Sequence, residues 1–150
     1  MYDTPTAPTL ELTGTFVGKE WTRAPVDEWA RGPEGTSLLG RAHIINVYDG
    51  DVEAEGAFEY LFAFPTAESG IDAATFVGLG RIVGRFGDRD GSLVVRHEGT
   101  SSPSDGIRGT MTVVPGSGTG ALGALGGTGE FSAGPGDHHR CTFRLTLAPA

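Results

Sequence analysis

Residues 113–134 read VVPGSGTGALGALGGTGEFSAG, and eight of these 22 residues are glycine. The stretch contains GTGALG at 118–123, a G-x-G-x-x-G pattern that binds a dinucleotide's pyrophosphate where it joins a strand to a helix. No helix is expected here, because Gly123 and then Gly126-Gly127 interrupt the segment, and position 143, twenty residues beyond Gly123, is phenylalanine rather than an acid. The glycines instead predict a tight connection between two strands.

The composition of the whole chain favours a folded, glycine-rich protein. Glycine accounts for 25 of 150 residues, more than double the usual ~7 %. A hydrophobic fraction of 38 % with eight phenylalanines argues against disorder. The net charge is −8, from 19 acidic and 11 basic residues, and no basic stripe is present. We therefore expect no nucleic-acid partner.

The single cysteine and the first residues bear on localisation. Cys141 has no intramolecular partner for a disulfide, which fits a reducing compartment. The first residues carry neither the cationic nor the apolar region of a secretion signal, and no run approaches the roughly 18 apolar residues of a membrane span. We expect a cytoplasmic protein without a membrane partner, and a disordered tail at residues 1–8.

Strand-like runs bounded by glycine, proline, aspartate and serine recur along the chain. The eight predicted strands are Thr9–Gly18, Leu38–Tyr48, Val52–Phe64, Ala73–Phe86, Ser92–Ser101, Ile107–Val114, Thr128–Ala133 and His139–Leu147. Most connections are short, as expected of hairpins. The pattern predicts one all-β domain over residues 1–150, an eight-stranded antiparallel up-and-down β-barrel, because closure removes exposed edges. The only long connection, Trp21–Gly35, predicts a lid-like insertion.

Alternation along the strands predicts which side chains face the lumen. In Val52–Phe64 the even positions from 58 to 64 are aromatic and several odd positions are acidic. A turn at GDRDG (87–91) pairs Phe86 with Leu93 and places His97 on the aromatic face. Burying the uncharged face costs less, because a charge in the lumen is expensive unless it is paired. The predicted ligand-contacting residues are Phe58, Phe62, Phe76, Phe131, Phe143, Asn46, Tyr48, Trp21, Trp29 and Cys141.

The opposite assignment of faces stays open at this point. It would bury a charged cluster and favour a polar or acidic ligand; that cluster is Glu55, Glu59, Arg81, Arg96 and Glu98. Glu55 and Glu59, four residues apart on one strand face, are then an alternative acid/base pair. With the aromatic face inside, the same glutamates oppose Arg81 or Arg85 across the outer wall.

Two lumen residues are candidates for catalysis. His97 can act as a general acid or base near neutral pH if it faces a cavity. Tyr60 can donate its hydroxyl to a developing oxyanion. For each residue, an ordinary barrel side chain with a satisfied hydrogen bond is the alternative. His138-His139 next to Asp137 suggests a metal, but adjacent strand residues point to opposite faces, and we expect no metal site.

Several motifs resemble known β-barrel families. GALGGTGEFSAG at 123–134 is similar to a glycine-rich segment of plant dirigent proteins and to the related stretch of allene oxide cyclases. A closer resemblance is to a bacterial family of unknown function placed with the allene oxide cyclase-like barrels. Its pattern is carried by EGAFEYL at 55–61, FVGLGRIVG at 76–84, GSLVVRHEGT at 91–100 and GTMTVVPGSGTG at 109–120.

This resemblance spans Leu10 to Leu147 and implies an eight-stranded barrel. Gly80 stands where the family pattern leads us to expect a carboxylate, so any role of that acid is absent here. The resemblance to allene oxide cyclases and dirigent proteins implies a cofactor-free cyclase or isomerase that steers ring closure of an apolar intermediate, such as a polyketide-, lipid- or terpene-like one. Excluding water and restricting conformers suits such a lumen.

Two other functions fit the same residues. A non-catalytic, lipocalin-like carrier or sensor of a small apolar molecule needs the same aromatic lining. A lumen packed solid with phenylalanine would instead leave function to the outer wall. In that case Val77, Leu79, Val83 and Val94 are expected to be buried in a homo-oligomer.

Overall fold

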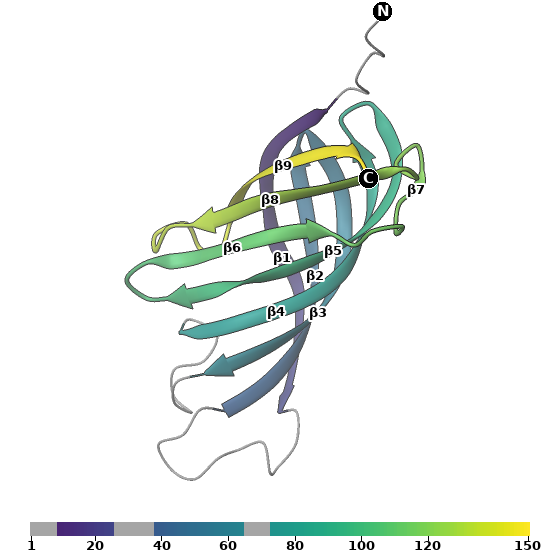
Figure 1. Ribbon diagram of the computed structural model, residues 1–150. Helices are drawn as coiled ribbons and strands as arrows, with labels where there is room; N and C mark the ends of the chain where they lie inside the picture. The colour runs from purple at the N-terminus through teal and green to yellow at the C-terminus, as the bar shows by residue number, and fades with distance from the viewer. Residues whose placement is uncertain (1–8, 26–37, 65–72) are drawn as a thin grey trace, which may run out of the picture.

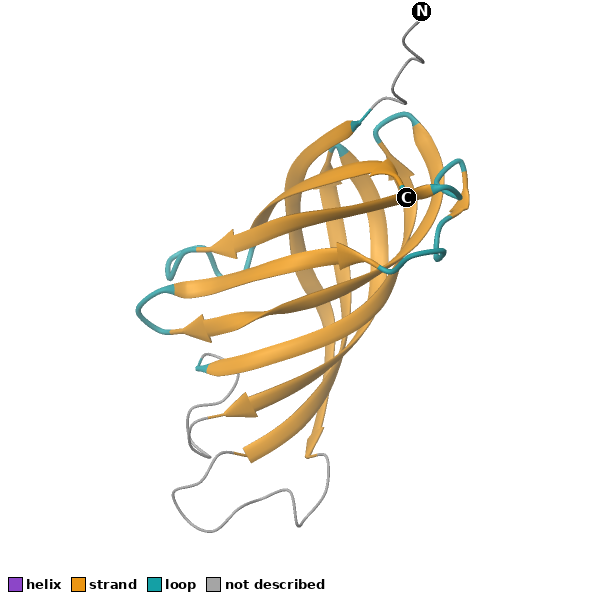
Figure 2. Ribbon diagram, in the orientation of Figure 1, coloured by secondary structure: helices purple, strands orange, loops and turns teal. Residues whose placement is uncertain are grey.

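Eight long strands follow one another as predicted, and a two-residue strand that was not predicted, β7, lies between the sixth and seventh of them. A computed structural model describes residues 9–25, 38–64 and 73–150. Its strands are β1 Leu10–Pro25, β2 Leu38–Gly50, β3 Val52–Phe64, β4 Ala74–Phe86, β5 Arg89–Ser102, β6 Gly106–Val113, β7 Thr119–Gly120, β8 Leu125–Ala133 and β9 Cys141–Pro149. Within these residues no helix is present (Figure 2). The described residues therefore contain no helix that is able to span a membrane.

The eight long strands form one closed antiparallel sheet. Each pairs with the next long strand along the chain, and β9 returns to pair with β1. The predicted up-and-down barrel is confirmed (Figure 1). We call the end with the start of β1, the C-terminus and β7 the terminal end. The opposite end carries the β5–β6 turn and the loop at 134–140, and we call it the far end.

The first strand is longer than predicted. It runs to Pro25, because β2 offers pairing partners along its whole length, from Gly14↔Gly50 to Pro25↔Gly40. Residues 21–25 of the predicted insertion Trp21–Gly35 are therefore strand residues, and that boundary is wrong. Residues 26–35, including Trp29, lie outside the described residues, as does the predicted tail at 1–8.

The hairpin of β4 and β5 has a different register from the predicted one. Phe86 pairs with Arg89 rather than with Leu93, and Ile82 rather than Phe86 faces Leu93. The turn contains only Gly87 and Asp88, and Gly87 has a φ of 65°, which glycine adopts without strain. Because 93 − 89 is an even number, every side chain keeps its predicted face.

The aromatic face lines the lumen, as predicted, and the alternative charged lumen is wrong. Phe58, His97 and Phe86 are fully buried, whereas Glu55 and Glu59 are exposed on the outer wall. Glycines make room for the rings, because a β-carbon at Gly80 would overlap the ring of Phe58. The same cross-strand pairing of ring and glycine recurs at Tyr60↔Gly78, Phe76↔Gly99, Phe131↔Gly109 and Phe143↔Gly14.

The glycine-rich stretch connects β6 to β8 and closes the terminal end, as a connection between the sixth and seventh long strands. Within it, β7 pairs with β5, and Leu122 is fully buried. The N–H groups of residues 121, 122 and 123 donate to the carbonyls of Asp90, Thr119 and Gly120. No helix follows, and these amides donate to backbone carbonyls rather than to a ligand. The glycines of the G-x-G-x-x-G pattern therefore allow a tight connection of the chain.

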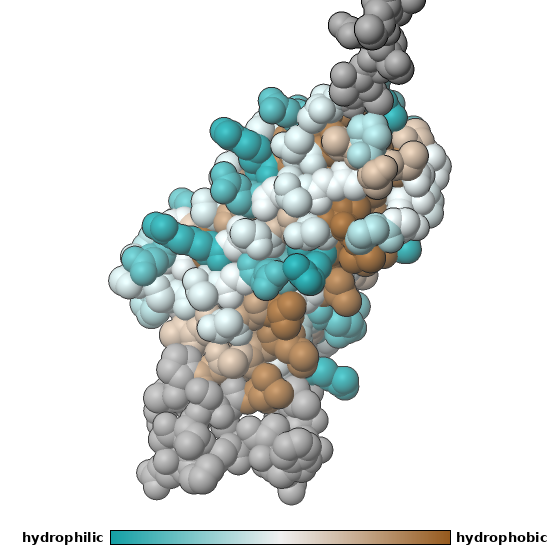
Figure 3. Space-filling view, viewed as in Figure 1, coloured by the Kyte–Doolittle hydropathy of each residue, from teal (hydrophilic) through white to brown (hydrophobic). Residues whose placement is uncertain are grey.

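The outer wall carries an apolar stripe. Leu61, Val77, Leu79 and Val83 point outward from β3 and β4 and are exposed, and Figure 3 shows apolar residues gathered on this side of the barrel. Arg85 and Glu53 form an ion pair of 2.7 Å between the same two strands. The homo-oligomer through this wall stays a prediction.

Candidate functional site

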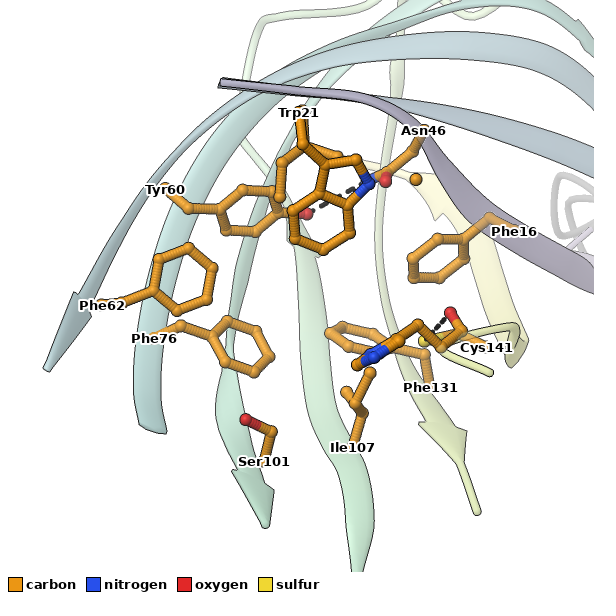
Figure 4. A pocket seen from close by; sticks show the side chains of 13 residues that line it. Phe16, Trp21, Asn46, Tyr60, Phe62, Phe76, Ser101, Ile107, Phe131 and Cys141 are labelled. Atoms are coloured by element: carbon orange, nitrogen blue, oxygen red, sulfur yellow. Dashed lines mark hydrogen bonds between the residues drawn. The ribbon is translucent and has the colours of Figure 1, made fainter. Parts of the chain in front are cut away.

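A cavity of about 60 Å³ lies inside the barrel toward the far end. Six of the residues predicted to contact a ligand and the catalytic candidate Tyr60 line it; the six are Trp21, Asn46, Phe62, Phe76, Phe131 and Cys141. Figure 4 shows their side chains converging from different strands onto one space. The barrel therefore holds a small pocket surrounded mainly by aromatic rings, and we call it the lumen pocket.

A β-bulge brings Trp21 into this pocket. The pairing of β1 with β2 shifts between Gly18 and Glu20, so that Lys19 has no partner across the strand pair. Without the extra residue Glu20 would face Ile44, but Trp21 takes that inward position instead. The indole lies against Gly18, where a β-carbon would come within 2.8 Å of it. Trp21 is 37 % exposed and forms part of the rim.

A hydrogen-bonded network of three buried side chains forms the polar part of the wall. The Asn46 Nδ2 group donates to the Tyr60 hydroxyl over 3.0 Å, and that hydroxyl lies 3.0 Å from His97 Nδ1. The residues come from β2, β3 and β5, and the strand register places them together. His97 packs between the rings of Phe58 and Phe131, at centroid distances of 4.5 and 4.7 Å.

Burial decides the protonation of this network. It lowers the pKa of His97 to about 3, so the imidazole is neutral at physiological pH. It also raises the pKa of Tyr60, which keeps the phenol protonated. His97 is fully buried and is not among the described residues that line the cavity. Its predicted role as a general acid or base stays a prediction.

Two buried polar atoms have no hydrogen-bond partner among the described residues: His97 Nε2 and the Tyr48 hydroxyl. Tyr48 stands next to the network, with its ring 5.0 Å from that of Phe16. Burial raises the pKa of the Tyr48 hydroxyl. The Asn46 side chain moderates that rise, but the two groups do not reach the geometry of a hydrogen bond.

Cys141 lines the pocket as a protonated thiol. Burial, and to a lesser extent the charge of Asp137, raises the pKa of this thiol to about 12. Its Sγ lies 3.8 Å from the His139 carbonyl oxygen, a weak contact. A thiol with such a pKa is not a nucleophile at neutral pH, so the residue contributes shape and polarisability.

Four of the predicted lumen residues do not line the cavity. Tyr48, Phe58, Phe143 and His97 all face the lumen, but they pack beyond the cavity and support its walls. Trp29 lies outside the described residues.

The predicted partners of the outer glutamates are wrong. Glu55 pairs with Lys19 over 3.4 Å, and Glu59 with His43 over 2.7 Å. The expected arginines have other contacts: Arg85 binds Glu53, and Arg81 donates to Ser92 Oγ. The cross-strand pairing explains this outcome, because Glu59 faces His43 directly on β2.

Six lining residues were missed by the sequence reasoning: Phe16, Gly18, Ile44, Ser101, Ile107 and His139. Alternation along β1 and β2 identifies Phe16 and Ile44 once their strands are placed. His139 carries no such signal, because it belongs to the far-end loop and has a φ of 64°. Its ring packs edge to face against the indole of Trp21, with the ring centroids 6.3 Å apart, so this loop contributes to the rim.

His138 and His139 both have positive φ and lie in a turn. The last strand begins at Cys141, so its predicted start at His139 is wrong. In the part of the chain that the structure describes, no three histidine, cysteine, aspartate or glutamate side chains are close enough to hold a metal ion.

Comparisons with known proteins place the chain in a family. The family model described as "Protein of unknown function (DUF3224)" matches residues 12–145. A crystal structure of a protein of unknown function from that family, from Shewanella oneidensis MR-1, is 26 % identical, with a TM-score of 0.70 over 95 % of this chain and 99 % of the other. No curated protein matches the chain. The chain therefore belongs to the DUF3224 family of proteins of unknown function.

Proposed function

We propose that the protein binds a small, largely apolar molecule in the lumen pocket. The observation that carries this proposal is a cavity whose wall is mainly aromatic and contains one buried polar network at Asn46 and Tyr60. Sites for small molecules commonly combine an apolar lining with a few fixed polar groups. Completely packed barrels need neither the cavity nor the buried hydroxyl.

The size of the cavity limits the ligand. At about 60 Å³ it is smaller than the roughly 150 Å³ of an engineered apolar cavity that binds benzene. A ligand of that size therefore enters only if a rim side chain moves. Trp21 is the side chain that can do so, because it lies at the rim and is partly exposed. We expect ligands of about benzene size to displace the indole.

The titration behaviour of the network favours binding over acid–base catalysis. His97 is neutral, and its Nδ1 is engaged with Tyr60, so it neither accepts nor delivers a proton at the cavity surface. A carrier or sensor of an apolar molecule needs no such transfer. It is therefore the function that the geometry supports best.

A cofactor-free cyclase or isomerase is the second candidate. It is favoured by the hydroxyl of Tyr60, which lies in the cavity wall and is held by two neighbours, an arrangement able to polarise a carbonyl. The sequence resemblance to allene oxide cyclases and dirigent proteins points the same way. Ring closure by conformer restriction needs no titrating residue.

Methyl NMR tests the binding proposal, because two isoleucines line the cavity and a third does not. Benzene titrated into protein with labelled isoleucine methyl groups is expected to shift Ile44 and Ile107, with little effect on Ile82 in the packed lumen. Ile107→Trp fills the pocket and abolishes the shifts at Ile44. Leu79→Trp on the outer wall is the matched control. Equal shifts at Ile82 and Ile44, or none at any site, would refute the lumen pocket as a binding site.

Turnover separates the two candidates. A small molecule that copurifies with the protein is incubated with fresh protein and followed by chromatography with mass detection. Cyclisation or isomerisation yields a product of unchanged mass and different retention time, and Tyr60→Phe is expected to stop its formation while binding persists. An unchanged ligand after prolonged incubation supports the carrier.

A further inference from the structure

We infer that the lumen pocket selects apolar ligands that carry a hydrogen-bond acceptor, such as the carbonyl of a ketone, aldehyde or ester, because the Tyr60 hydroxyl hydrogen is directed to the ligand. The inference rests on the proposed function and names the ligand class of the same site. It follows from counting the donors and acceptors of the buried network.

The Tyr60 hydroxyl has one hydrogen to donate and an oxygen that accepts hydrogen bonds. Asn46 Nδ2 donates to that oxygen over 3.0 Å. The second neighbour, His97 Nδ1, stands 3.0 Å away and has two possible roles. If Nδ1 is bare, it takes the hydroxyl hydrogen; if Nδ1 carries the proton, it donates to the Tyr60 oxygen.

The surroundings of the other imidazole nitrogen decide between these roles. Nε2 is buried without a hydrogen-bond partner among the described residues, and the rings of Phe16, Phe58 and Phe131 surround the imidazole. A proton on Nε2 would leave an N–H donor unpaired in a closed aromatic environment. A proton on Nδ1 leaves an unused acceptor at Nε2 and the hydroxyl hydrogen of Tyr60, and the second group lines the cavity, where a molecule can accept the hydrogen. The neutral imidazole therefore carries its proton on Nδ1.

With this tautomer the Tyr60 oxygen accepts two hydrogen bonds, one from Asn46 and one from His97. The hydroxyl hydrogen is then left over, because among the described residues the Tyr60 hydroxyl has no hydrogen-bond partner besides Asn46 and His97. Tyr60 lines the lumen pocket, and Figure 4 shows its hydroxyl pointing inward among the other lining residues. The hydrogen therefore finds its acceptor on a molecule in the pocket.

This arrangement sets a preference among ligands of equal shape. A carbonyl oxygen satisfies the hydroxyl hydrogen, whereas a hydrocarbon leaves it unpaired in an apolar site. An ammonium group brings only donors, and none of the described residues that line the pocket is a carboxylate that could pair with it. His97 determines this preference without contacting the ligand, because its Nδ1–H donates to the Tyr60 oxygen and leaves the hydroxyl hydrogen for the ligand.

The tautomer is measured first, on the protein without added ligand. Long-range ¹H–¹⁵N correlation of the histidine rings distinguishes a proton on Nδ1 from one on Nε2. We expect His97 to show the Nδ1–H form at pH 7. An Nε2–H form would overturn the inference, and it would leave the proposed binding of apolar molecules intact.

The ligand preference is measured with cyclopentanone and methylenecyclopentane, which differ only in C=O against C=CH₂. The affinity ratio of the two probes is compared between the wild-type protein and Tyr60→Phe, so that their different hydration cancels. Tyr60→Phe is expected to lower the ratio by roughly threefold to tenfold, the value of one neutral hydrogen bond. If both probes bind but the ratio is unchanged, the inference is overturned and the proposed binding function is not. This result is expected if the Asn46 amide has the reverse orientation and its oxygen accepts the Tyr60 hydrogen.

A wild-type measurement covers the case in which Tyr60→Phe does not fold. The carbonyl stretching band of ¹³C-labelled cyclopentanone, recorded with excess protein, is expected at a lower frequency than in cyclohexane. A bound ketone whose band matches that in cyclohexane has no hydrogen bond and overturns the inference. If neither probe binds, the proposed function and the inference fail together.

Discussion

The two ends of the barrel lumen differ in packing and in chemistry. At the terminal end the interior is wholly apolar and closed, with Leu12, Val52, Phe86, Leu93, Leu122 and Leu147 buried. Toward the far end the same strands enclose a cavity with Asn46, Tyr60 and Cys141 in its wall. The polar side chains of the cavity wall lie next to the buried His97 and Tyr48, and none of them is at the closed end beside Leu122. The difference matches the proposed binding of a ligand toward the far end.

The closure of the terminal end comes from the glycine-rich connection. The pairing of β7 with β5 places Leu122 over the lumen. The Leu122 side chain lies next to Gly91, with Cδ1 3.3 Å from the position of a β-carbon added there. At the far end the described part of the rim includes two single side chains, Trp21 and His139, whose rings pack edge to face. A backbone segment makes a permanent plug, whereas a side chain at the rim can rotate.

The largest expected effect tests the plug. Leu122→Ala leaves a void at the closed end and is expected to lower the free energy of unfolding by about 2–5 kcal/mol. Urea denaturation measures this value. Leu79→Ala, on the exposed wall, is the matched control and should change the stability by no more than about 0.5 kcal/mol. Equal effects of the two substitutions would mean that the terminal end is not closed by packing.

A second substitution tests the pairing of rings with glycines in the middle of the lumen. In Gly80→Ala the new methyl group overlaps the Phe58 ring, so we expect a loss of about 1–3 kcal/mol in the free energy of unfolding. Gly136→Ala is the control, because no atom lies within 4 Å of its added carbon. A stable Gly80→Ala protein would show that Phe58 has room to move, and that the cavity extends further than it does here.

The pH dependence of stability tests the buried imidazole. The folded-state pKa of His97, about 3, lies below the 6.5 of a free histidine. The unfolded chain therefore binds a proton that the native protein does not, and the contribution of His97 is complete above pH 6.5 and is lost as the pH falls toward 3. Between pH 6.5 and 5.0 the wild-type protein should lose about 1.5 kcal/mol more than His97→Gln, measured by urea denaturation. Parallel pH profiles for the two proteins would contradict a neutral, buried His97.

The barrel itself could be predicted from local patterns, and the site only in part. β3 matches its predicted bounds, because alternation marks the strand and the Asp49-Gly50 dipeptide before it is a hairpin signal. Trp21 was placed in an insertion, because a β-bulge at Lys19 is invisible in the residue pattern. The predicted inward and outward faces of β4 and β5 are correct although the predicted register is wrong, because the two registers differ by an even number of residues. The contacts of Tyr60 with Asn46 and His97 depend on three strand registers at once, so no local pattern contains them.

The smallest expected effect compares two buried tyrosines. Tyr48 and Tyr60 are about equally buried, but only the Tyr60 hydroxyl has hydrogen-bond partners among the described residues. Tyr60→Phe removes those bonds and leaves Asn46 and His97 unpaired, so a loss of about 1–2 kcal/mol in the free energy of unfolding is expected. Tyr48→Phe removes an unpaired hydroxyl, so we expect no loss or a gain of up to about 1 kcal/mol.

Thermal and urea denaturation of the two variants give the sign of this difference. A clear destabilisation by Tyr48→Phe would mean that its hydroxyl is satisfied, for example by a buried water that also serves His97 Nε2. The interior beyond the cavity would then be partly hydrated. The Asn46–Tyr60–His97 network would no longer separate a dry terminal end from a polar pocket. A neutral or stabilising Tyr48→Phe keeps that boundary at the Asn46–Tyr60–His97 network.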